Sequence, residues 1–596
     1  MAASANPPSA RAWWKSAVVY QIYPISFFDS NGDGFGDLNG ILAKLDYLKS
    51  LGVDVLWLSP IYRSPLADMG YDIADYREID SRYGTLADWD RLIAGVHERG
   101  MKLMMDLVVN HTSDEHEWFV QSRSDKDTSR NPKRNWYIWR PPKYDAHGNR
   151  QPPNNWKSVF QGSAWDYDEQ TQECYLHLYV SKQPDLNWDN SAVRNAVFDL
   201  MEWWINRGCD GFRMDVINII SKVDGLPDAP VADPKEQYQP ASAFFANGPR
   251  VHQYIKEMND RVLSRHDLIT VGETPFTQNA QDLLPYVLPS RRELNMVFQF
   301  ELMGIDSHID PYGSDVPLIP KEWKLKNLKE VITRWQTFER EAGFWNAVFI
   351  ENHDHSRSVS RFGNDSPEWR SLSAKLLSML EITQSGTLYI YQGQEIGMKN
   401  APPTWGLEEY KDVATINYWN SVLEKRKRES PGLDVDMSDV MDGIRRKARD
   451  HARTPMQWKD LPHAGFTSGT PWMRVNDDYQ EWNVAAQLES RTSVWSFWKH
   501  ALEIRKTYDV LIYGDFTLLS PEHEQVFAYT RVLGESIALV LLNFHHTPVQ
   551  FSLDEVPHLI GAPFILGNYS PTDDREAATS IISLREYEGR VYIVKT

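Results

Sequence analysis

Acidic side chains recur in four short segments that each end an apolar run, namely DLVVNH, GFRMD, VGE and ENHD. In GFRMD, Arg213 and Asp215 alternate with Met214, so in an extended strand both side chains point to the same side. Glu273 ends VGE, and Asp354 ends ENHD. Gathering carboxylates in one place is costly, because like charges repel and burial opposes ionisation. The pattern therefore favours a chemical role, in which the cation of Arg213 keeps Asp215 ionised.

Acids grouped in this way suit chemistry on glycosidic bonds. The sequence contains no glycine loop typical of dinucleotide binding and no cluster of Cys and His, so we expect no organic cofactor. In glycoside hydrolysis one carboxylate attacks the sugar or activates water, and a second protonates the departing oxygen. At neutral pH the two groups can share this work only if their pKa values differ.

These acids need a scaffold that brings the ends of several strands together. Up to about residue 400, short β-branched runs alternate with longer amphipathic stretches, which predicts parallel strands joined by helices. We expect eight strands, at 18–28, 53–59, 102–109, 211–216, 268–273, 296–302, 347–352 and 387–391. Eight such units predict an α/β fold, a (β/α)8 TIM barrel, in which functional residues lie at the carboxyl ends of the strands.

Two connections are much longer than the loops that usually join strand and helix, and long loops in compact domains are usually functional. The first predicts a small inserted domain at 112–190, between barrel segments 1–111 and 191–514. The second spans about 398–490 and precedes a predicted helix at 493–508. From 515 to 596, short alternating runs such as VFAYTRV and SIALVLLNF predict a C-terminal antiparallel β-sandwich.

Composition excludes several classes of partner. The net charge is −19, with 63 basic and 82 acidic residues, and no basic run is long enough to follow a phosphate backbone, so we expect no nucleic acid partner. No run of residues is apolar enough to span a membrane, and no secretory signal precedes WWKS. Only Cys174 and Cys209 are present, which fits a reducing compartment. We therefore expect a cytoplasmic protein, and a monomer by default.

The ordered segments DLVVNH, QPDLNW, GFRMDVIN, GET and ENHD resemble the sequence regions of the α-amylase family, glycoside hydrolase family thirteen. The segments YQIYPISFFDSNGDGFGDLNGI, DMGYDIADY and ARTPMQW are further similar to its oligo-1,6-glucosidase and maltase branch, which includes yeast and fungal cytosolic enzymes. The resemblance covers about residues 13–590. It implies a retaining, exo-acting α-glucosidase that releases α-glucose from the non-reducing end of short α-glucosides.

The resemblance also implies roles for individual residues. Asp215 would be the nucleophile and Glu273 the general acid and base, with carboxyl groups about 5 Å apart in a retaining pair. Asp354 would stabilise the transition state. The expected substrate-binding residues are Asp68, Tyr71, His111, Arg213, Val216, His353 and Arg453. Among these, Tyr71 would stack under the sugar, and Asp68, paired with Arg453, would close the end of the pocket.

A separate motif, DSNGDGFGD at 29–37, has the oxygen spacing of a calcium loop. The expected ligands are the side chains of Asp29, Asn31, Asp33 and Asp37 and the carbonyl of Phe35, while Gly34 permits the turn. The acidic ligand usual at position twelve is missing, because Gly40 stands there. We expect a structural Ca²⁺, or Mg²⁺ in the same cage, and the same family branch has such a site. A plain polar turn is the alternative.

The choice of glucosidic linkage rests on Val216, which follows the predicted nucleophile. In the branch that this chain resembles, Val at this position accompanies α-1,6 hydrolysis, whereas Thr or Ala accompanies α-1,4. Isomaltose-type substrates are therefore preferred, with an α-1,4-specific maltase or sucrose-active α-glucosidase as the alternative. A sucrose isomerase shares the scaffold, but the charged cluster that such enzymes carry after strand six is not evident in MGIDSHIDPYGSDVPL. A silent transporter heavy chain would need a membrane helix.

Overall fold

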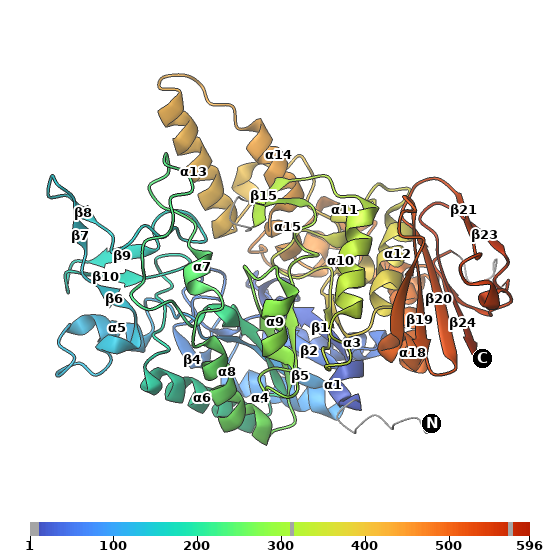
Figure 1. Ribbon diagram of the computed structural model, residues 1–596, viewed down its shortest axis with the longest axis horizontal. Helices are drawn as coiled ribbons and strands as arrows, with labels where there is room; N and C mark the ends of the chain where they lie inside the picture. The colour runs from blue at the N-terminus through green and yellow to red at the C-terminus, as the bar shows by residue number, and fades with distance from the viewer. Residues whose placement is uncertain (1–10, 310–314, 570–575, 596) are drawn as a thin grey trace.

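The barrel expected from the sequence is present in the computed structural model, which describes residues 11–309, 315–569 and 576–595. Eight parallel strands form one sheet in the order β13-β12-β11-β5-β2-β1-β17-β16 (Figure 1). Their bounds are β1 Val18–Ile22, β2 Val55–Leu58, β5 Lys102–Val108, β11 Gly211–Asp215, β12 Ile269–Glu273, β13 Met296–Phe298, β16 Ala347–Val348 and β17 Thr387–Tyr391. All eight predicted strands are confirmed, although several are shorter than expected.

The shorter strands have local causes. β1 ends at Ile22 because Pro24, which has no N–H to donate, begins a 3-10 turn over Pro24–Ser26. β16 has only two residues, so the ENHD segment lies in the loop that follows it. The two outer strands of the sheet close the barrel, because Phe298 at the end of β13 packs edge to face on Phe349 after β16, with ring centroids 4.9 Å apart.

Helices surround the barrel, each packing an apolar face on the strands. In α6, Val193, Val197, Met201 and Trp204 are buried at helical spacing, and the side chain of Asn190 caps the first turn. The helices of this layer are α2 Leu38–Ala43, α3 Leu45–Leu51, α4 Leu86–Glu98, α6 Ser191–Asn206, α8 Val251–Arg261, α9 Ala280–Val287, α10 Leu325–Thr337, α12 Arg370–Ile382 and α17 Val494–Thr507.

Two long connections extend from the barrel (Figure 1). Between β5 and α6 the chain forms α5 Glu117–Ser124, the sheet β6-β10-β9 and the hairpin β7-β8, with strands β6 Trp139–Arg140, β7 Lys143–Tyr144, β8 Arg150–Gln151, β9 Trp165–Asp168 and β10 Glu173–Leu176. After β17 it forms α13 Val413–Glu429, α14 Ser438–Lys447, α15 Asp450–Arg453 and α16 Val484–Glu489. Figure 1 shows α13 and α14 projecting from one end of the molecule.

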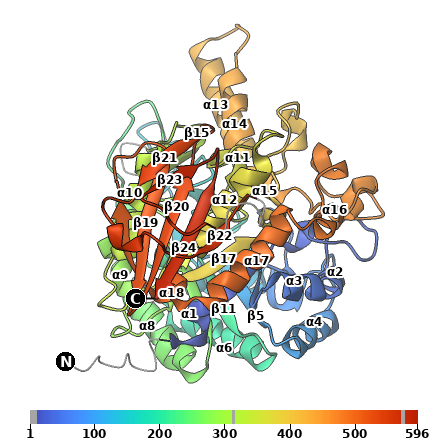
Figure 2. The ribbon, with the colours of Figure 1, turned by 90° about the vertical axis from the view of Figure 1, so that its right-hand side faces the viewer.

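The C-terminal residues form antiparallel sheets, as predicted. One sheet has the order β18-β19-β20-β24-β22, and a second pairs β21 with β23. The strands are β18 Asp515–Leu519, β19 Val526–Leu533, β20 Ser536–Asn543, β21 Val549–Ser552, β22 Phe564–Gly567, β23 Ile581–Leu584 and β24 Gly589–Lys595. Figure 2 shows the larger sheet beside α12 and α17, and Arg531 joins it to the barrel by donating to the carbonyls of Thr383 and Gly514.

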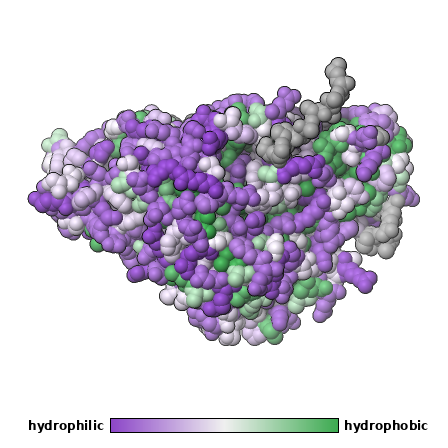
Figure 3. All heavy atoms as spheres, turned by 90° about the horizontal axis from the view of Figure 1, so that it is seen from below, coloured by the Kyte–Doolittle hydropathy of each residue, from purple (hydrophilic) through white to green (hydrophobic). Residues whose placement is uncertain are grey.

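The surface agrees with the composition of the chain. The face seen in Figure 3 is mostly hydrophilic, with apolar residues scattered over it. In the part of the chain that the structure describes, no helix combines the length and the apolar character needed to cross a membrane. The predictions made on the first ten residues lie outside the described residues.

Candidate active site

A cavity of about 490 Å³ opens at the carboxyl ends of the barrel strands, where such folds build their sites. Most of the predicted site residues line it: Asp68, Tyr71, His111, Asp215, Val216, Glu273 and Asp354. Arg213, His353 and Arg453 instead lie behind this lining in the described structure and contact the residues that form it. The barrel therefore brings all ten residues to one place, in two layers.

Arg213 holds the acids of the cavity floor together. On β11 it lies opposite Asp106 of β5 and Val271 of β12, so its side chain enters the barrel between two acid-bearing strands. Its Nη1 atom lies 2.7 Å from Asp106 and 2.8 Å from Asp215, and its Nη2 atom lies 2.6 Å from Glu273. One buried guanidinium thus faces three carboxylates, which explains why so much negative charge can lie here.

Asp215 and Glu273 act on each other directly. Burial raises the pKa of both groups, while Arg213 opposes that rise by favouring their ionised forms. Asp215 lies on Nη1 and Glu273 on Nη2 of the same guanidinium, and the negative charge of Glu273 further raises the pKa of Asp215. They therefore titrate as a pair. Two carboxyls held by one guanidinium are compatible with the separation of about 5 Å expected of a retaining pair.

Asp354 is held in its ionised form. Burial alone would raise its pKa, but His353, Arg449 and Arg453 outweigh burial and lower it well below the usual range. Its Oδ1 atom accepts from Arg449 at 2.9 Å and from Arg453 at 3.0 Å. Asp354 thus differs from Asp215 and Glu273, whose pKa values are raised, and can act as a fixed negative charge.

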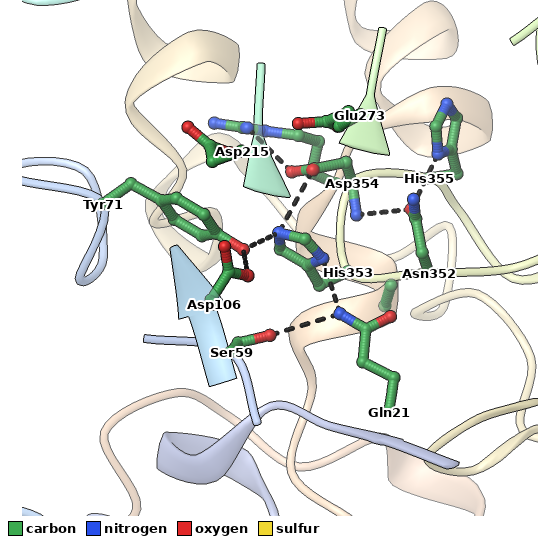
Figure 4. A network of polar contacts seen from close by, with 12 residues as sticks. Gln21, Ser59, Tyr71, Asp106, Asp215, Glu273, Asn352, His353, Asp354 and His355 are labelled. Atoms are coloured by element: carbon green, nitrogen blue, oxygen red, sulfur yellow. Dashed lines mark hydrogen bonds and ion pairs between the residues drawn. The ribbon is translucent and has the colours of Figure 1, made fainter. Parts of the chain in front are cut away.

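His353 and Tyr71 form a hydrogen-bonded chain under the acids (Figure 4). The two rings stack at 5.3 Å with an angle of 7°, and the Tyr71 hydroxyl lies 2.6 Å from Nε2 of His353 and 3.0 Å from Asp106. Gln21 lies 2.8 Å from Nδ1 of His353 and 3.2 Å from the hydroxyl of Ser59. Burial lowers the pKa of His353 well below its usual value, so the ring is neutral and serves as a hydrogen-bonding bridge.

The end of the cavity that Asp68 lines differs from the prediction in one pairing. Asp68 was expected to pair with Arg453, but its ion pair is with Arg449, at 3.6 Å, so that expectation is wrong. Arg453, the last residue of α15, instead pairs with Asp354 and Asp412. Arg449 precedes α15 by one residue and reaches Asp68, Asp354 and Asp412 together. The first arginine of ARDHAR, four residues before Arg453, was the available signal for this residue.

His111 lies at the same end, on the loop after β5. Its Nε2 atom lies 3.2 Å from the carbonyl of Tyr71 and 3.2 Å from Nε2 of Gln183, and Gln183 also donates to Asp68 at 3.0 Å. Burial lowers the pKa of His111 to about 4, so the ring is neutral at neutral pH. Gln183, the first residue of QPDLNW, therefore contacts both His111 and Asp68, two of the residues predicted to bind the sugar.

The geometry can be compared with known proteins. A family model described as the catalytic domain of α-amylase matches residues 21–514. The chain belongs to the α-amylase family. An oligo-1,6-glucosidase of Parageobacillus thermoglucosidasius is 49% identical over 589 residues, which cover 98% of this chain and 99% of that protein. An α-glucosidase of Schizosaccharomyces pombe is 47% identical over 580 residues, covering 97% of each chain.

Solved structures agree with this α-amylase family membership. The isomaltulose synthase of Protaminobacter rubrum superposes with a TM-score of 0.89 at 40% identity, covering 98% of this chain and 99% of that one. The trehalose-6-phosphate hydrolase of Bacillus licheniformis superposes with a TM-score of 0.88 at 40% identity, covering 98% and 100% of the two chains. The resemblance drawn from the sequence motifs is confirmed.

In this family member, Val216 has an unusual backbone. Its φ of 38° and ψ of 41° are left-handed, a region that β-branched residues rarely occupy, and its N–H donates to Glu273 at 3.2 Å. The turn directs the Val216 side chain into the cavity lining beside the two catalytic candidates. The residue predicted to influence linkage is thus placed where it can contact a substrate.

The aromatic lining of the site consists of Phe and Tyr. Phe160, Tyr179, Phe245, Phe276, Phe300 and Tyr418 join Tyr71 around the cavity. Among the described residues that line it there is no Trp, although the chain has 23. Large Trp side chains such as Trp57, Trp89 and Trp204 are instead fully buried. The abundance of Trp therefore reflects core packing more than sugar stacking.

The predicted metal loop lies after β1. Gly34 has a φ of 93°, as a sharp turn requires, and Asp29 accepts the N–H groups of Asn31, Gly32 and Gly34. Asp37 caps α2 by accepting from the N–H of Gly40. Within the described residues no group of three or more His, Cys, Asp or Glu is arranged to hold a metal ion. A site here thus needs the additional oxygens of Asn31 and Phe35, and oxygen-only ligands suit a hard cation.

Proposed function

We propose that the protein is a retaining, exo-acting α-glucosidase that releases α-glucose from short α-glucosides, with a preference for α-1,6 links. The observation that carries the proposal is the placement of Asp215 and Glu273 on one guanidinium, that of Arg213, in a cavity whose lining includes Asp68 and Arg449. The curated relatives at 43–49% identity are named oligo-1,6-glucosidases and α-glucosidases, which supports this substrate class.

The proposed reaction is a double displacement. In the proposed starting state Asp215 is ionised beside Arg213 and Glu273 carries the proton. Asp215 attacks the anomeric carbon while Glu273 gives its proton to the departing oxygen, which leaves a glucosyl ester on Asp215. Glu273 then takes a proton from water, and that water displaces Asp215. The two inversions give α-glucose.

Exo action follows from the closed end of the cavity. The Oδ1 atom of Asp68 is buried and accepts no hydrogen bond from the described residues, and burial raises the pKa of this carboxyl to about 7. Such an oxygen is costly unless a ligand satisfies it, and hydroxyls at the non-reducing end of a glucose can do so. Arg449 lies beside Asp68, and we propose that the two side chains leave room for a single terminal glucose.

The preference for one glucosidic linkage is also a proposal. Val216 supports α-1,6 links, and an α-1,4-specific maltase or sucrose-active α-glucosidase is the alternative. Isomaltulose synthases among the structural neighbours, at 39–40% identity, favour a sucrose isomerase as a second candidate. The loop that would carry the charged cluster of such an isomerase includes residues 310–314, which lie outside the described residues.

One experiment separates these functions. The protein is incubated with isomaltose, maltose and sucrose in turn, and the products are followed by proton NMR. We expect α-glucose as the first anomer and a higher kcat/KM for isomaltose than for maltose or sucrose. Isomaltulose as the main product would instead support the isomerase, and β-glucose appearing first would refute retention.

We also propose that the loop at 29–37 binds Ca²⁺, or Mg²⁺ in the same cage. Asp29, Asn31, Asp33 and Asp37 would supply side-chain oxygens and Phe35 its carbonyl, in the spacing of a calcium loop. The turn at Gly34 and the position of Asp29 support the proposal. The ion would hold the loop after β1 in place, away from the chemistry on the sugar.

Location and assembly are proposals of the same kind. Cys174 and Cys209 are both buried and unpaired, which supports a reducing compartment such as the cytoplasm. We propose a monomer that acts on small sugars. Size-exclusion chromatography with light scattering would give a mass near 69.0 kDa, and a multiple of that mass would refute the monomer.

A further inference from the structure

His355 lines the same cavity but lies away from the pocket for the terminal glucose. Figure 4 places it beyond Glu273 and Asp354, on the side opposite Tyr71 and Asp215. Its electrostatic neighbours are Arg361, Lys447 and Asp306 as well as Asp354, whereas those of Asp68 are Arg449, Arg453, Asp412 and Asp72. Because Glu273 protonates the departing oxygen, the leaving group must begin on this side of the acids. His355 is therefore placed beside the leaving group, the aglycone.

The hydrogen bonds around His355 determine which ring nitrogen carries its proton. The backbone N–H of Asp354 donates to Oδ1 of Asn352 at 2.8 Å, which fixes that atom as the carbonyl oxygen of the amide. Nδ1 of His355 lies 2.7 Å from the same oxygen, so Nδ1 must carry a hydrogen. In a neutral ring the other nitrogen, Nε2, then has a free lone pair.

The ring stays neutral over the working range of a cytoplasmic enzyme. Burial and the nearby cation of Arg361 together lower the pKa of His355 to about 3. Within the described residues, the hydrogen bond to Asn352 is made by Nδ1, and Nε2 has no hydrogen-bond partner. The cavity therefore presents an acceptor beside the aglycone, where a bound sugar has hydroxyl donors to offer.

We propose that His355 is a specificity-determining residue, whose Nε2 atom accepts a hydrogen bond from a hydroxyl of the sugar that leaves. The inference rests on the proposed α-glucosidase function and deepens it. It predicts that the site prefers a sugar as the leaving group to a leaving group without a hydroxyl. A site built to pair with a hydroxyl discriminates against leaving groups that lack one, because its acceptor then stays unpaired.

Two variants separate this role from a purely structural one. In His355→Gln the side-chain amide reaches the place of Nε2 but loses the hydrogen bond to Asn352. In His355→Asn the amide keeps the place of Nδ1 and the bond to Asn352 but offers nothing at Nε2. The measured quantity is the ratio of kcat/KM for isomaltose to kcat/KM for α-glucosyl fluoride, whose leaving fluoride has no hydroxyl.

We expect this ratio to fall about five- to tenfold in His355→Asn and to stay within about twofold of wild type in His355→Gln. The loss should be the same from about pH 5 to about pH 8, because the ring does not titrate there. The reverse order of the two variants, or an equal loss on both substrates, would overturn the proposal. If the wild type hydrolyses neither substrate, the proposed function itself fails.

Discussion

At the scale of single residues, Arg213 controls the ionisation of the catalytic pair. Its cation lowers the pKa of Asp215 and Glu273 against the effect of burial. In Arg213→Met that help is lost, both pKa values rise, and Asp215 becomes protonated at a higher pH than in the wild type. We expect the acidic limb of the kcat/KM profile, measured from about pH 4 to about pH 9, to move upward by about one unit or more.

Arg453→Met is the matched control for that profile. It removes a buried arginine of the same site that pairs with Asp354 and Asp412 but not with the catalytic pair. An acidic limb that moves equally in both variants, or in neither, would contradict the assignment of Arg213.

Val216 is a second single residue whose role can be tested by substitution. Its side chain lines the cavity from a left-handed turn directly after Asp215. In Val216→Thr the shape is nearly kept and one methyl becomes a hydroxyl, so the ratio of isomaltose to maltose hydrolysis should fall about tenfold. Steady-state kinetics on the two disaccharides measure it, and equal ratios in both proteins would remove Val216 from the account of linkage.

The positions of site residues could be predicted where they follow from the spacing of residues along a strand. Arg213 and Asp215 point to one side because they are two apart in a strand, and Glu273 follows from the end of the next strand. Pairings between distant loops were not predictable. Asp68 could have met Arg449 or Arg453, since both lie in ARDHAR, and only the placement of α15 decides between them.

At the scale of elements, the loop between β1 and α2 offers a direct test of the proposed metal. If the loop binds Ca²⁺, removing the ion with a chelator should lower the midpoint of thermal unfolding by a few degrees, and added Ca²⁺ should restore it. In Asp33→Ala, which removes an exposed predicted ligand, the midpoint should no longer respond to either treatment. Differential scanning calorimetry gives both values, and an equal response in wild type and variant would contradict the site.

Hydrophobic periodicity predicted the strands that build the barrel. All eight barrel strands and helix α17 lie where hydrophobic patterns placed them, because buried parallel strands need continuous apolar runs. Strand ends were less predictable, since Pro24 and the closure of the barrel shortened β1 and β16. The runs predicted for the C-terminal sheets did not include strands β18, β22 and β23, which are only four or five residues long.

At the scale of the whole molecule, three parts of the chain build one cavity. The barrel supplies the acids, Phe160 and Tyr179 come from the connection after β5, and Tyr418 and Arg449 come from the connection after β17. Long connections were predicted to be functional, but how they meet over the barrel depends on packing between segments more than two hundred residues apart. Specificity for the aglycone is therefore a property of the assembled molecule.

The central claim is that Asp215 forms a covalent bond to the sugar while Glu273 transfers the proton. The most direct test is to incubate the protein with 5-fluoro-α-glucosyl fluoride, which slows release of the glucosyl enzyme, and to map the labelled peptide by mass spectrometry. We predict one fluoroglucosyl group per chain, on Asp215, and none in Asp215→Asn. A label on any other residue, or turnover of the reagent without a labelled chain, would contradict the double displacement.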